Sequence, residues 1–406
     1  MEGSHTIVHG AEELVRGPGT DDPLEVIEDG AVVIEEGVII EVGQTEEIER
    51  RFPPENATTT IDASDQVVVP GLVDSHTHAV FAGDRSDEFA ARLAGADYQQ
   101  ILAEGGGILR TVRAVREASE AELRDNLLDI LDLMLAHGST TVEVKSGYGL
   151  STESECKMLR AVAAADALHP IELVATFLGA HAVPPEMDRD EYVDHVIDEQ
   201  LPAVVDAGLA TYCDVFCDEG AFTRDESARI LRVADEHGLG LKIHAEEFAR
   251  LGGAELAATL NATSADHLLQ ATDSDAQALA DAGVVPTLLP GTAFTLGVEY
   301  ADFERFTDAG SWPAIASDFN PNCHSPSMVM TVQLATHGMG MAPDMALRAA
   351  TAEAAHALDR PDLGRLDEGS PGDLIILDSP SRLHLPYSFG INPVEAVIKD
   401  GRVVHD

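Results

Sequence analysis

The chain has 406 residues, of which 45% are hydrophobic, enough for one large domain with a buried core and a second, small domain. Acidic residues outnumber basic residues by 72 to 25, which gives a formal net charge of −47. A surface of this sign repels nucleic acid and anionic membranes, so neither is an expected partner. No apolar run approaches the ~20 residues that span a bilayer. The first residues also lack the basic and apolar regions of a secretory signal, so we expect a cytoplasmic protein.

The acidic residues are spread along the whole chain and do not form a tail. This distribution favours a halophilic protein, because high salt screens the repulsion between carboxylates while the carboxylates keep the surface hydrated. The charge therefore indicates the habitat of the protein and not its reaction. It also implies that an anionic substrate must meet a local positive centre.

Strand-like and helix-like stretches alternate along most of the chain. Up to about residue 66 we expect short strands and turns, with a β-hairpin formed by 31–35 and 38–42. After the segment 67–78, the predicted strands are 140–144, 171–176, 212–216, 241–244, 264–267, 284–288 and 314–317. The predicted helices are 107–117, 119–137, 151–168, 189–206, 224–237, 252–260, 273–282, 326–338 and 343–357. The last predicted strands are 372–378, 394–399 and 402–405.

Eight strands that are each followed by helical sequence are typical of a (β/α)8 TIM-type barrel. A doubly wound open sheet is the alternative. We favour the barrel because polar residues end the strands throughout the series, where barrels place their active sites, and no glycine-rich dinucleotide fingerprint follows a strand. We expect the barrel to comprise residues 67–369, and residues 1–66 and 370–406 to form a composite β-sandwich domain.

Two histidines, His76 and His78, end the first strand of this series. Because side chains alternate along a strand, both face the same side, which is the interior at the mouth of a barrel. Imidazole is the commonest ligand of transition metals in proteins. An HxH pair alone is a weak signal, since histidines in a core or on a surface bind no metal. Later strands, however, end in further candidates: His244, His267 and Asp318.

The order HxH, His, His and Asp on successive strands resembles the amidohydrolase superfamily and, within it, the imidazolonepropionase family. The segments that carry this resemblance are 74–85, 104–108, 143–150, 176–181, 214–218, 244–248 and 317–321. The resemblance covers nearly the whole chain. It implies a hydrolase of histidine degradation that opens the cyclic amide of 4-imidazolone-5-propanoate to give N-formimidoyl-L-glutamate. By analogy, it also implies a homodimer.

The resemblance implies four ligands for one Zn2+ or Fe3+ ion: His76, His78, His244 and Asp318. Three nitrogens and one carboxylate suit either metal and leave room for a water molecule. Asp318 and Glu247 are candidates for taking a proton from that water, and His267 for donating a hydrogen bond to the carbonyl oxygen. An ordinary surface acid is the alternative for Glu247, since the chain has 72 acidic residues.

Lys145 ends the second predicted strand rather than the fourth. We therefore expect no lysine that bridges two metal ions. The alternative role for Lys145 is an ion pair with Glu143 or another nearby carboxylate.

Arg85 lies in the first loop at the barrel mouth, seven residues after His78. A propanoate tail needs a cation, and the planar guanidinium of arginine matches a carboxylate. We therefore expect Arg85 to bind the substrate carboxylate. A surface ion pair with Asp84 or Asp87 is the alternative.

The resemblance implies further substrate contacts from Tyr148, His181, Glu247 and Asn320. After Asn320 and a proline the family usually continues Gly-Ser, whereas this chain has Asn322 and Cys323. Both remain candidate substrate contacts, because asparagine tolerates a positive φ and a thiol is a weak donor. For Tyr148 and His181, ordinary packing is the alternative.

Two other functions compete with this interpretation. A related mononuclear amidohydrolase, such as a guanine or cytosine deaminase, would need no arginine for a carboxylate, so Arg85 and Tyr148 argue against it. A metal-binding scaffold without activity would be indicated by the loss of a ligand or of the acid and base. All of these residues are present.

The charge of −47 predicts that folding requires molar salt, because only high ionic strength screens the repulsion between carboxylates at close range. A thermal melt in 3 M KCl should therefore show a much higher midpoint than a melt in 0.1 M KCl. Equal midpoints would contradict the halophilic interpretation.

Overall fold

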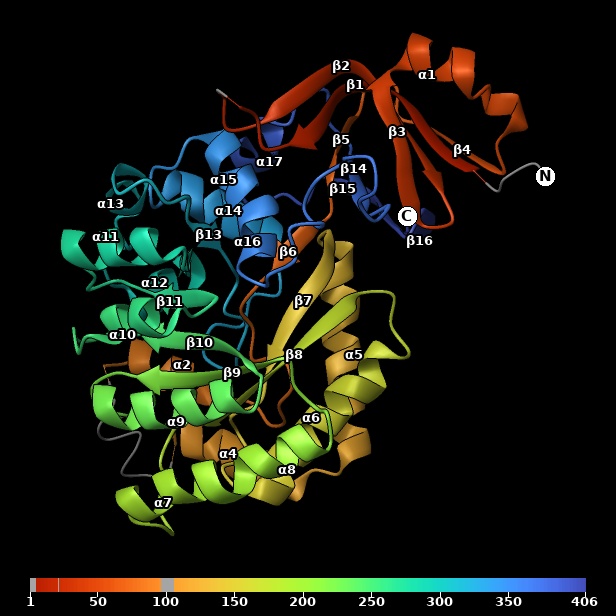
Figure 1. Cartoon of the computed structure of the whole chain (residues 1–406). Coiled ribbons are helices and arrows are strands. Elements are labelled where there is room, and N and C mark those ends of the chain that lie inside the picture. The colour runs from red at the N-terminus through yellow and green to blue at the C-terminus, as the bar shows by residue number, and fades with distance from the viewer. Residues whose placement is uncertain (1–4, 21, 96–105) are drawn as a thin grey trace.

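The computed structural model describes residues 5–20, 22–95 and 106–406. Residues 104 and 105, which belong to one of the segments named above, lie outside the described residues. Within the described part the chain forms two eight-stranded sheets, one parallel and one mixed. Figure 1 shows the mixed sheet beside one end of the parallel one, with strands from the start and the end of the chain side by side in red and blue.

The parallel sheet follows the chain from β6 to β13 and is wrapped by helices, which confirms the predicted barrel. Its strands are β6 (Leu72–Asp74), β7 (Ser139–Lys145), β8 (Glu172–Ala180), β9 (Tyr212–Cys217), β10 (Gly240–Ala245), β11 (Ser264–His267), β12 (Val285–Leu288) and β13 (Ala314–Ile315). In β7 every residue is buried, as expected for a parallel strand that is covered on both faces.

The helices follow the predicted periodicity closely. They are α2 (Ser86–Leu93), α4 (Ile108–Glu117), α5 (Glu120–Ala136), α6 (Thr152–Asp166), α7 (Arg189–His195), α8 (Leu201–Asp206), α9 (Arg224–Glu236), α10 (Gly253–Leu260), α11 (Asp273–Ala282), α12 (Pro290–Leu296), α13 (Phe303–Asp308), α14 (Met328–His337), α15 (Pro343–Ala349), α16 (Ala352–His356) and α17 (His384–Tyr387). Capping boxes begin α5 and α9, at Ser119 with Glu122 and at Thr223 with Glu226, which explains why these starts could be predicted.

Hydrogen bonds between the segment after β6 and the segment after β13 close the barrel. Thr77 forms a parallel bridge with Phe319. The N–H of Asp318 donates to the carbonyl of His76 at 3.0 Å, and the N–H of His78 donates to the carbonyl of Phe319 at 2.8 Å. This seam places Asp318 directly beside the HxH pair.

The mixed sheet has the order β16-β15-β14-β5-β1-β2-β3, and β4 pairs with β1. Its strands are β1 (His5–Gly17), β2 (Glu25–Glu35), β3 (Val38–Gln44), β4 (Thr59–Asp62), β5 (Val67–Pro70), β14 (Leu374–Leu377), β15 (Val394–Lys399) and β16 (Arg402–His405). Val8 and Val32 from the N-terminal strands share one core cluster with Leu374 and Ile398 from the C-terminal strands. The two-domain division remains a proposal. Because β5 pairs within this sheet, we place the junction at Gly71 rather than at residue 67.

Several segments differ from the prediction. Helices α2, α12, α13 and α17 lie where no helix was predicted. Residues 45–51, expected to be strand or turn, form helix α1 (Thr45–Arg51), which buries Ile48 and has acids in its first turn and bases in its last, as the helix dipole favours. A short 3-10 turn, η1 (Pro54–Asn56), follows it. The predicted helix 189–206 contains a π-turn, η2 (Val196–Gln200), just before Pro202, since proline lacks the N–H that would continue the ladder. The predicted helix 343–357 is broken at Thr351, whose backbone is not helical.

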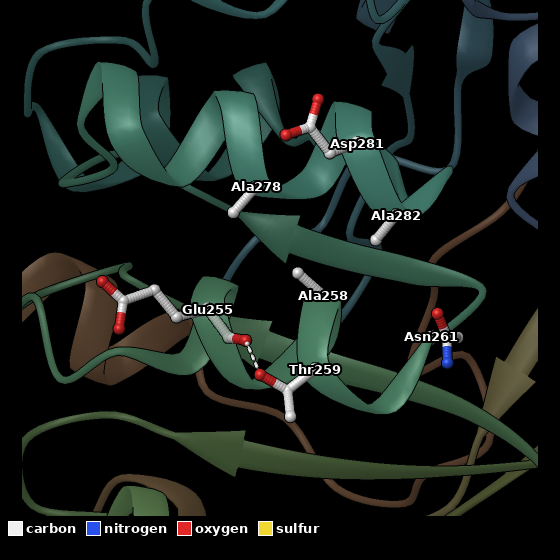
Figure 2. Close-up of a pocket in the computed structure, with 7 residues that line it drawn as sticks. All are labelled: Glu255, Ala258, Thr259, Asn261, Ala278, Asp281 and Ala282. Carbon is white, nitrogen blue, oxygen red and sulfur yellow. Dashed lines mark hydrogen bonds between the residues drawn. The ribbon is translucent and has the colours of Figure 1, made fainter.

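No helix among the described residues combines the length and the apolar character needed to cross a bilayer. On the outer wall, a shallow depression lies between α10 and α11 (Figure 2). Its lining residues are Glu255, Ala258, Thr259, Asn261, Ala278, Asp281 and Ala282. None of them is a predicted site residue, so the candidate site must be sought at the ends of the barrel strands.

Candidate active site

The predicted metal ligands lie together where the barrel strands end. His76 and His78 follow β6, His244 is in β10, and Asp318 follows β13, while His267 ends β11. Each of these residues is at most 3% exposed. The ring centroids of His76 and His78 lie 5.4 Å apart, and those of His76 and His244 lie 4.5 Å apart. The structure therefore brings together the residues that the sequence pattern singled out.

The facing atoms of this cluster have spacings that suit one metal ion. Nε2 of His76 and Nε2 of His78 each lie 3.6 Å from Oδ1 of Asp318, and Nε2 of His244 lies 3.3 Å from Nε2 of His78. Ligands ~2.1 Å from a tetrahedral ion are ~3.4 Å from one another. Nε2 of His76 is buried without a hydrogen-bond partner among the described residues, as expected of an atom that binds a metal. The donor set thus fits a metal ion.

Two buried aspartates contact the opposite edges of two of these imidazoles. Oδ2 of Asp266 lies 2.6 Å from Nδ1 of His76, and Oδ2 of Asp214 lies 2.9 Å from Nδ1 of His244. A carboxylate at Nδ1 fixes the proton there and leaves the lone pair of Nε2 for a metal. The tautomer that a metal requires is therefore built into two of the three histidines.

Burial keeps the imidazoles of His76, His78 and His267 neutral. The pKa values of His76, His78 and His267 lie well below their ordinary range, first because burial penalises the charged form and then because of neighbouring positive groups such as Lys145. A metal binds the neutral imidazole, so this environment favours binding.

Asp318 is held in one orientation. Its Oδ2 accepts a hydrogen bond from Oγ1 of Thr292, and its Oδ1 accepts one from Nδ2 of Asn320 at 3.0 Å. Its backbone has φ +48, in the left-handed region that aspartate tolerates better than most residues. These constraints turn Oδ1 toward His76 and His78.

Glu247 lies in the loop after β10, next to His267. Its Oε2 lies 3.7 Å from Nε2 of His267. The pKa of Glu247 is well above its usual range, first because of burial and then because of the negative charges of Asp318 and Asp218. The carboxylate of Asp218 accepts hydrogen bonds at 2.7–3.0 Å from the backbone N–H groups of 247–249 and so fixes this loop. A carboxyl group with a raised pKa beside metal ligands has the properties of a proton-transfer group.

Tyr148 and His181 also line this mouth. The ring of His181 stacks on that of His78, with centroids 4.9 Å apart and an angle of 19°, and its Nδ1 lies 3.1 Å from the carbonyl of Gly147. The ring of Tyr148 lies 5.2 Å from that of His181. Burial lowers the pKa of His181 to about 3, so its imidazole is neutral and can exchange a hydrogen bond without adding charge.

Arg85 is nearly buried and pairs with neither of the acids considered above. Its Nε donates to Oε2 of Glu88 at 2.8 Å, and Glu88 is its only ion-pair partner within the described ranges. Burial raises the pKa of Tyr148, and the positive charge of Arg85 acts through space to lower it. A cation thus acts through space on one of the candidate substrate contacts, Tyr148.

The loop after Asp318 is organised by Asn320. Its Oδ1 accepts hydrogen bonds from the N–H of Asn322 at 2.7 Å and of Cys323 at 3.0 Å, while its Nδ2 donates to Asp318. The thiol of Cys323 lies 3.7 Å from the carbonyl of Ser317, and burial raises its pKa to about 12. Within this structure these side chains shape the loop, and their contacts with a substrate remain predictions.

Sequence reasoning missed the residues that orient the ligands. Asp266 directly precedes His267, and Asp214 is the middle residue of the otherwise apolar predicted strand 212–216. A search for carboxylates on strands next to each ligand strand could have found both. Thr292 carries no signal, because its role depends on where α12 begins relative to Asp318.

Comparisons with known proteins agree with this geometry. Residues 67–404 match the amidohydrolase family. The imidazolonepropionase of Haloarcula marismortui is 58% identical over 400 residues, which cover 98% of this chain and 95% of the relative, and that of Geobacillus kaustophilus is 49% identical over 97% and 94%. A solved atrazine chlorohydrolase from Arthrobacter aurescens, complexed with zinc, has a TM-score of 0.74 at 18% identity over 99% and 95% of the two chains, which shows the fold alone. The chain belongs to the imidazolonepropionase family of the amidohydrolases.

Proposed function

We propose that this chain hydrolyses the ring amide of 4-imidazolone-5-propanoate to N-formimidoyl-L-glutamate, a step of histidine degradation. The observation that carries the proposal is the identity of 58% to imidazolonepropionases of Haloarcula marismortui and Halobacterium salinarum over nearly the whole chain. The site supports it, because a metal-ligand cluster, a proton-transfer carboxyl group and an arginine lie at one barrel mouth. The acidic composition fits relatives from these two organisms, and the cytoplasm remains the predicted location.

We propose that one Zn2+ or Fe3+ ion is held by His76, His78, His244 and Asp318. The balance of buried charge supports a cation there. The buried carboxylates near the histidines outnumber the buried ammonium groups. The carboxylates are those of Glu143, Asp214, Asp266 and Asp318, and the ammonium groups are those of Lys145 and Lys242. Unbalanced buried charge is costly, and an added cation would offset it. When bound, the ion would lower the pKa of a water molecule and polarise the substrate carbonyl.

We propose that Glu247 is the principal proton acceptor. Both oxygens of Asp318 already accept hydrogen bonds, whereas the carboxyl group of Glu247 faces only His267 among the described side chains. Glu247 would take a proton from the attacking water and transfer it to the ring nitrogen as the C–N bond breaks. His267 would donate a hydrogen bond to the carbonyl oxygen as negative charge develops. Asp318 remains the alternative acceptor.

We propose that Arg85 binds the propanoate tail and that Tyr148 and His181 contact the ring or the tail. Glu88 supports the proposal for Arg85, because it holds Nε and so turns the guanidinium without enclosing it. The alternative functions, a deaminase or a scaffold without activity, have no use for an arginine placed in this way.

We also propose a homodimer. Exposed apolar side chains gather in and on either side of α17, at Leu383, Tyr387, Phe389 and Ile391. They lie within 379–394, a stretch that contains no acidic residue in a chain with 72 of them. Since two copies of so acidic a chain repel each other, a segment that contributes no carboxylate of its own is where they could meet.

The proposed activity predicts that purified enzyme in high salt removes the absorbance of the imidazolone substrate only when it holds metal. Elemental analysis should find about one Zn or Fe per chain, and chelation should abolish turnover until either ion is restored. His76→Ala should lose the metal, whereas His237→Ala, at the end of α9, should keep it. Two ions per chain at full occupancy would contradict the single-ion site, and a metal-loaded enzyme without turnover would contradict the function.

The role of Glu247 predicts that Glu247→Gln lowers kcat by about 10²–10⁴-fold, because a positioned general base contributes about that factor. The metal content should not change, since Glu247 is not among the proposed ligands. Glu219→Gln, which neutralises an exposed acid, is the control and should retain full kcat. Loss of the metal from Glu247→Gln would show that Glu247 is a ligand instead.

The role of Arg85 predicts that Arg85→Ala lowers kcat/KM by roughly 30-fold to several thousand-fold, since removing one partner of a desolvated charge pair costs ~2–5 kcal/mol. On a substrate analogue without the carboxylate, wild type and variant should turn over at similar rates. Arg110→Ala is the matched control, because Arg110 also approaches Glu88, at 3.6 Å, but is more exposed. If Arg85→Ala is equally defective on both substrates, Arg85 does not bind the tail.

A further inference from the structure

Two fully buried lysines lie inside the barrel, Lys145 in β7 and Lys242 in β10. An ammonium group inside a protein is costly unless it is paired and hydrogen-bonded. Both lysines contact Glu143, at 2.9 Å and 3.0 Å, so both belong to one charge cluster. Beyond Glu143, the two lysines contact different groups, so we expect them to have different roles.

Lys145 contacts the two aspartates that orient the histidines. Its Nζ lies 2.8 Å from Oδ2 of Asp214 and 3.8 Å from Oδ2 of Asp266. These same oxygens face Nδ1 of His244 and Nδ1 of His76. One ammonium group therefore links two candidate metal ligands on different strands through their carboxylate partners.

Among the described residues, Lys242 contacts neither aspartate directly, although its charge also acts on Asp266 through space. Its Nζ donates to the carbonyl of Ser75 at 2.9 Å and to Oε2 of Glu143, and within the described ranges its only ion pair is with Glu143. The chain thus contains a matched pair: two lysines with the same burial in the same cluster, of which only one touches the orienting carboxylates.

This inference rests on the proposed metal centre. We propose that Lys145 is a positioning residue that holds Asp214 and Asp266 in place. These two carboxylates in turn orient Nε2 of His244 and of His76 toward the metal. Oδ2 of each carboxylate lies within 3.8 Å of the same Nζ, so the two negative charges are close together. Without the ammonium between them they would repel each other and move. Each histidine would then lose the contact that sets its tautomer and ring orientation.

The test compares Lys145→Met with Lys242→Met, each of which removes one buried ammonium group and keeps a similar volume. The metal affinity of the apoprotein is measured with Zn2+ against a chromophoric chelator in molar salt, and the ligand geometry from the visible absorption of the Co2+-loaded protein. Loss of an outer partner of a ligand typically weakens binding 10–100-fold. Lys145→Met should show this loss and an altered Co2+ spectrum, whereas Lys242→Met should stay within about threefold of wild type, although both should melt at a lower temperature.

A double-mutant cycle keeps the proposal testable if Lys145→Met does not fold. Asp266→Asn combined with Lys145→Met removes one charge of each sign. Because Lys145 acts through the aspartates, Lys145→Met should weaken Zn2+ binding clearly less when it is added to Asp266→Asn than when it is added to the wild type. If Lys145→Met alone cannot be measured, adding it to Asp266→Asn should still weaken Zn2+ binding by less than about 10-fold.

The outcomes separate this proposal from the one on which it rests. Wild-type protein that binds no Zn2+ would contradict the metal centre itself. Wild-type protein that binds Zn2+, with Lys145→Met of equal affinity or with Lys242→Met equally weakened, would contradict only the role of Lys145. Fully additive effects in the cycle would do the same.

Discussion

The seam that closes the barrel is the constraint on which the site depends. The backbone bonds from Asp318 to His76 and from His78 to Phe319 join the first and last strands of the parallel sheet and at the same time set three candidate ligands side by side. A metal ion would tie the same two segments together through their side chains. Binding and barrel closure should therefore stabilise each other, as in any protein whose metal site exists only in the folded state.

Carboxylates have two separate uses in this chain. On the surface they are abundant and exposed to salt. At the barrel mouth a few are buried and accept hydrogen bonds from backbone N–H groups: Glu155 holds the loop that carries Tyr148, and Asp218 holds the loop that carries Glu247. Buried bonds of this kind are screened far less by salt than surface pairs are. Salt can thus act strongly on folding while the loops of the site keep their shape.

The barrel and the clustering of His76, His78 and Asp318 could be predicted from the sequence, because strand periodicity and strand-end position are local properties. Helix α1 could not, since its single buried residue carries a weak periodic signal. Nor could the pairing of Arg85 with Glu88 rather than with a nearer acid, which depends on how α2 begins. Contacts such as that of Lys145 with Asp214 join different strands, and only the register of the sheet determines them.

The pairing of β5 with β14 has a consequence for the order in which the chain can fold during synthesis. β6 follows β5 directly, but β14 is among the last strands that the ribosome produces, and Phe319 also emerges late. Until then β5 lacks β14, one of its partners in the mixed sheet, and β6 lacks the seam that closes the barrel. Long-range pairings of this kind form slowly. The nascent chain must therefore keep its HxH segment without its final partners for most of translation, and the site is completed only near the end.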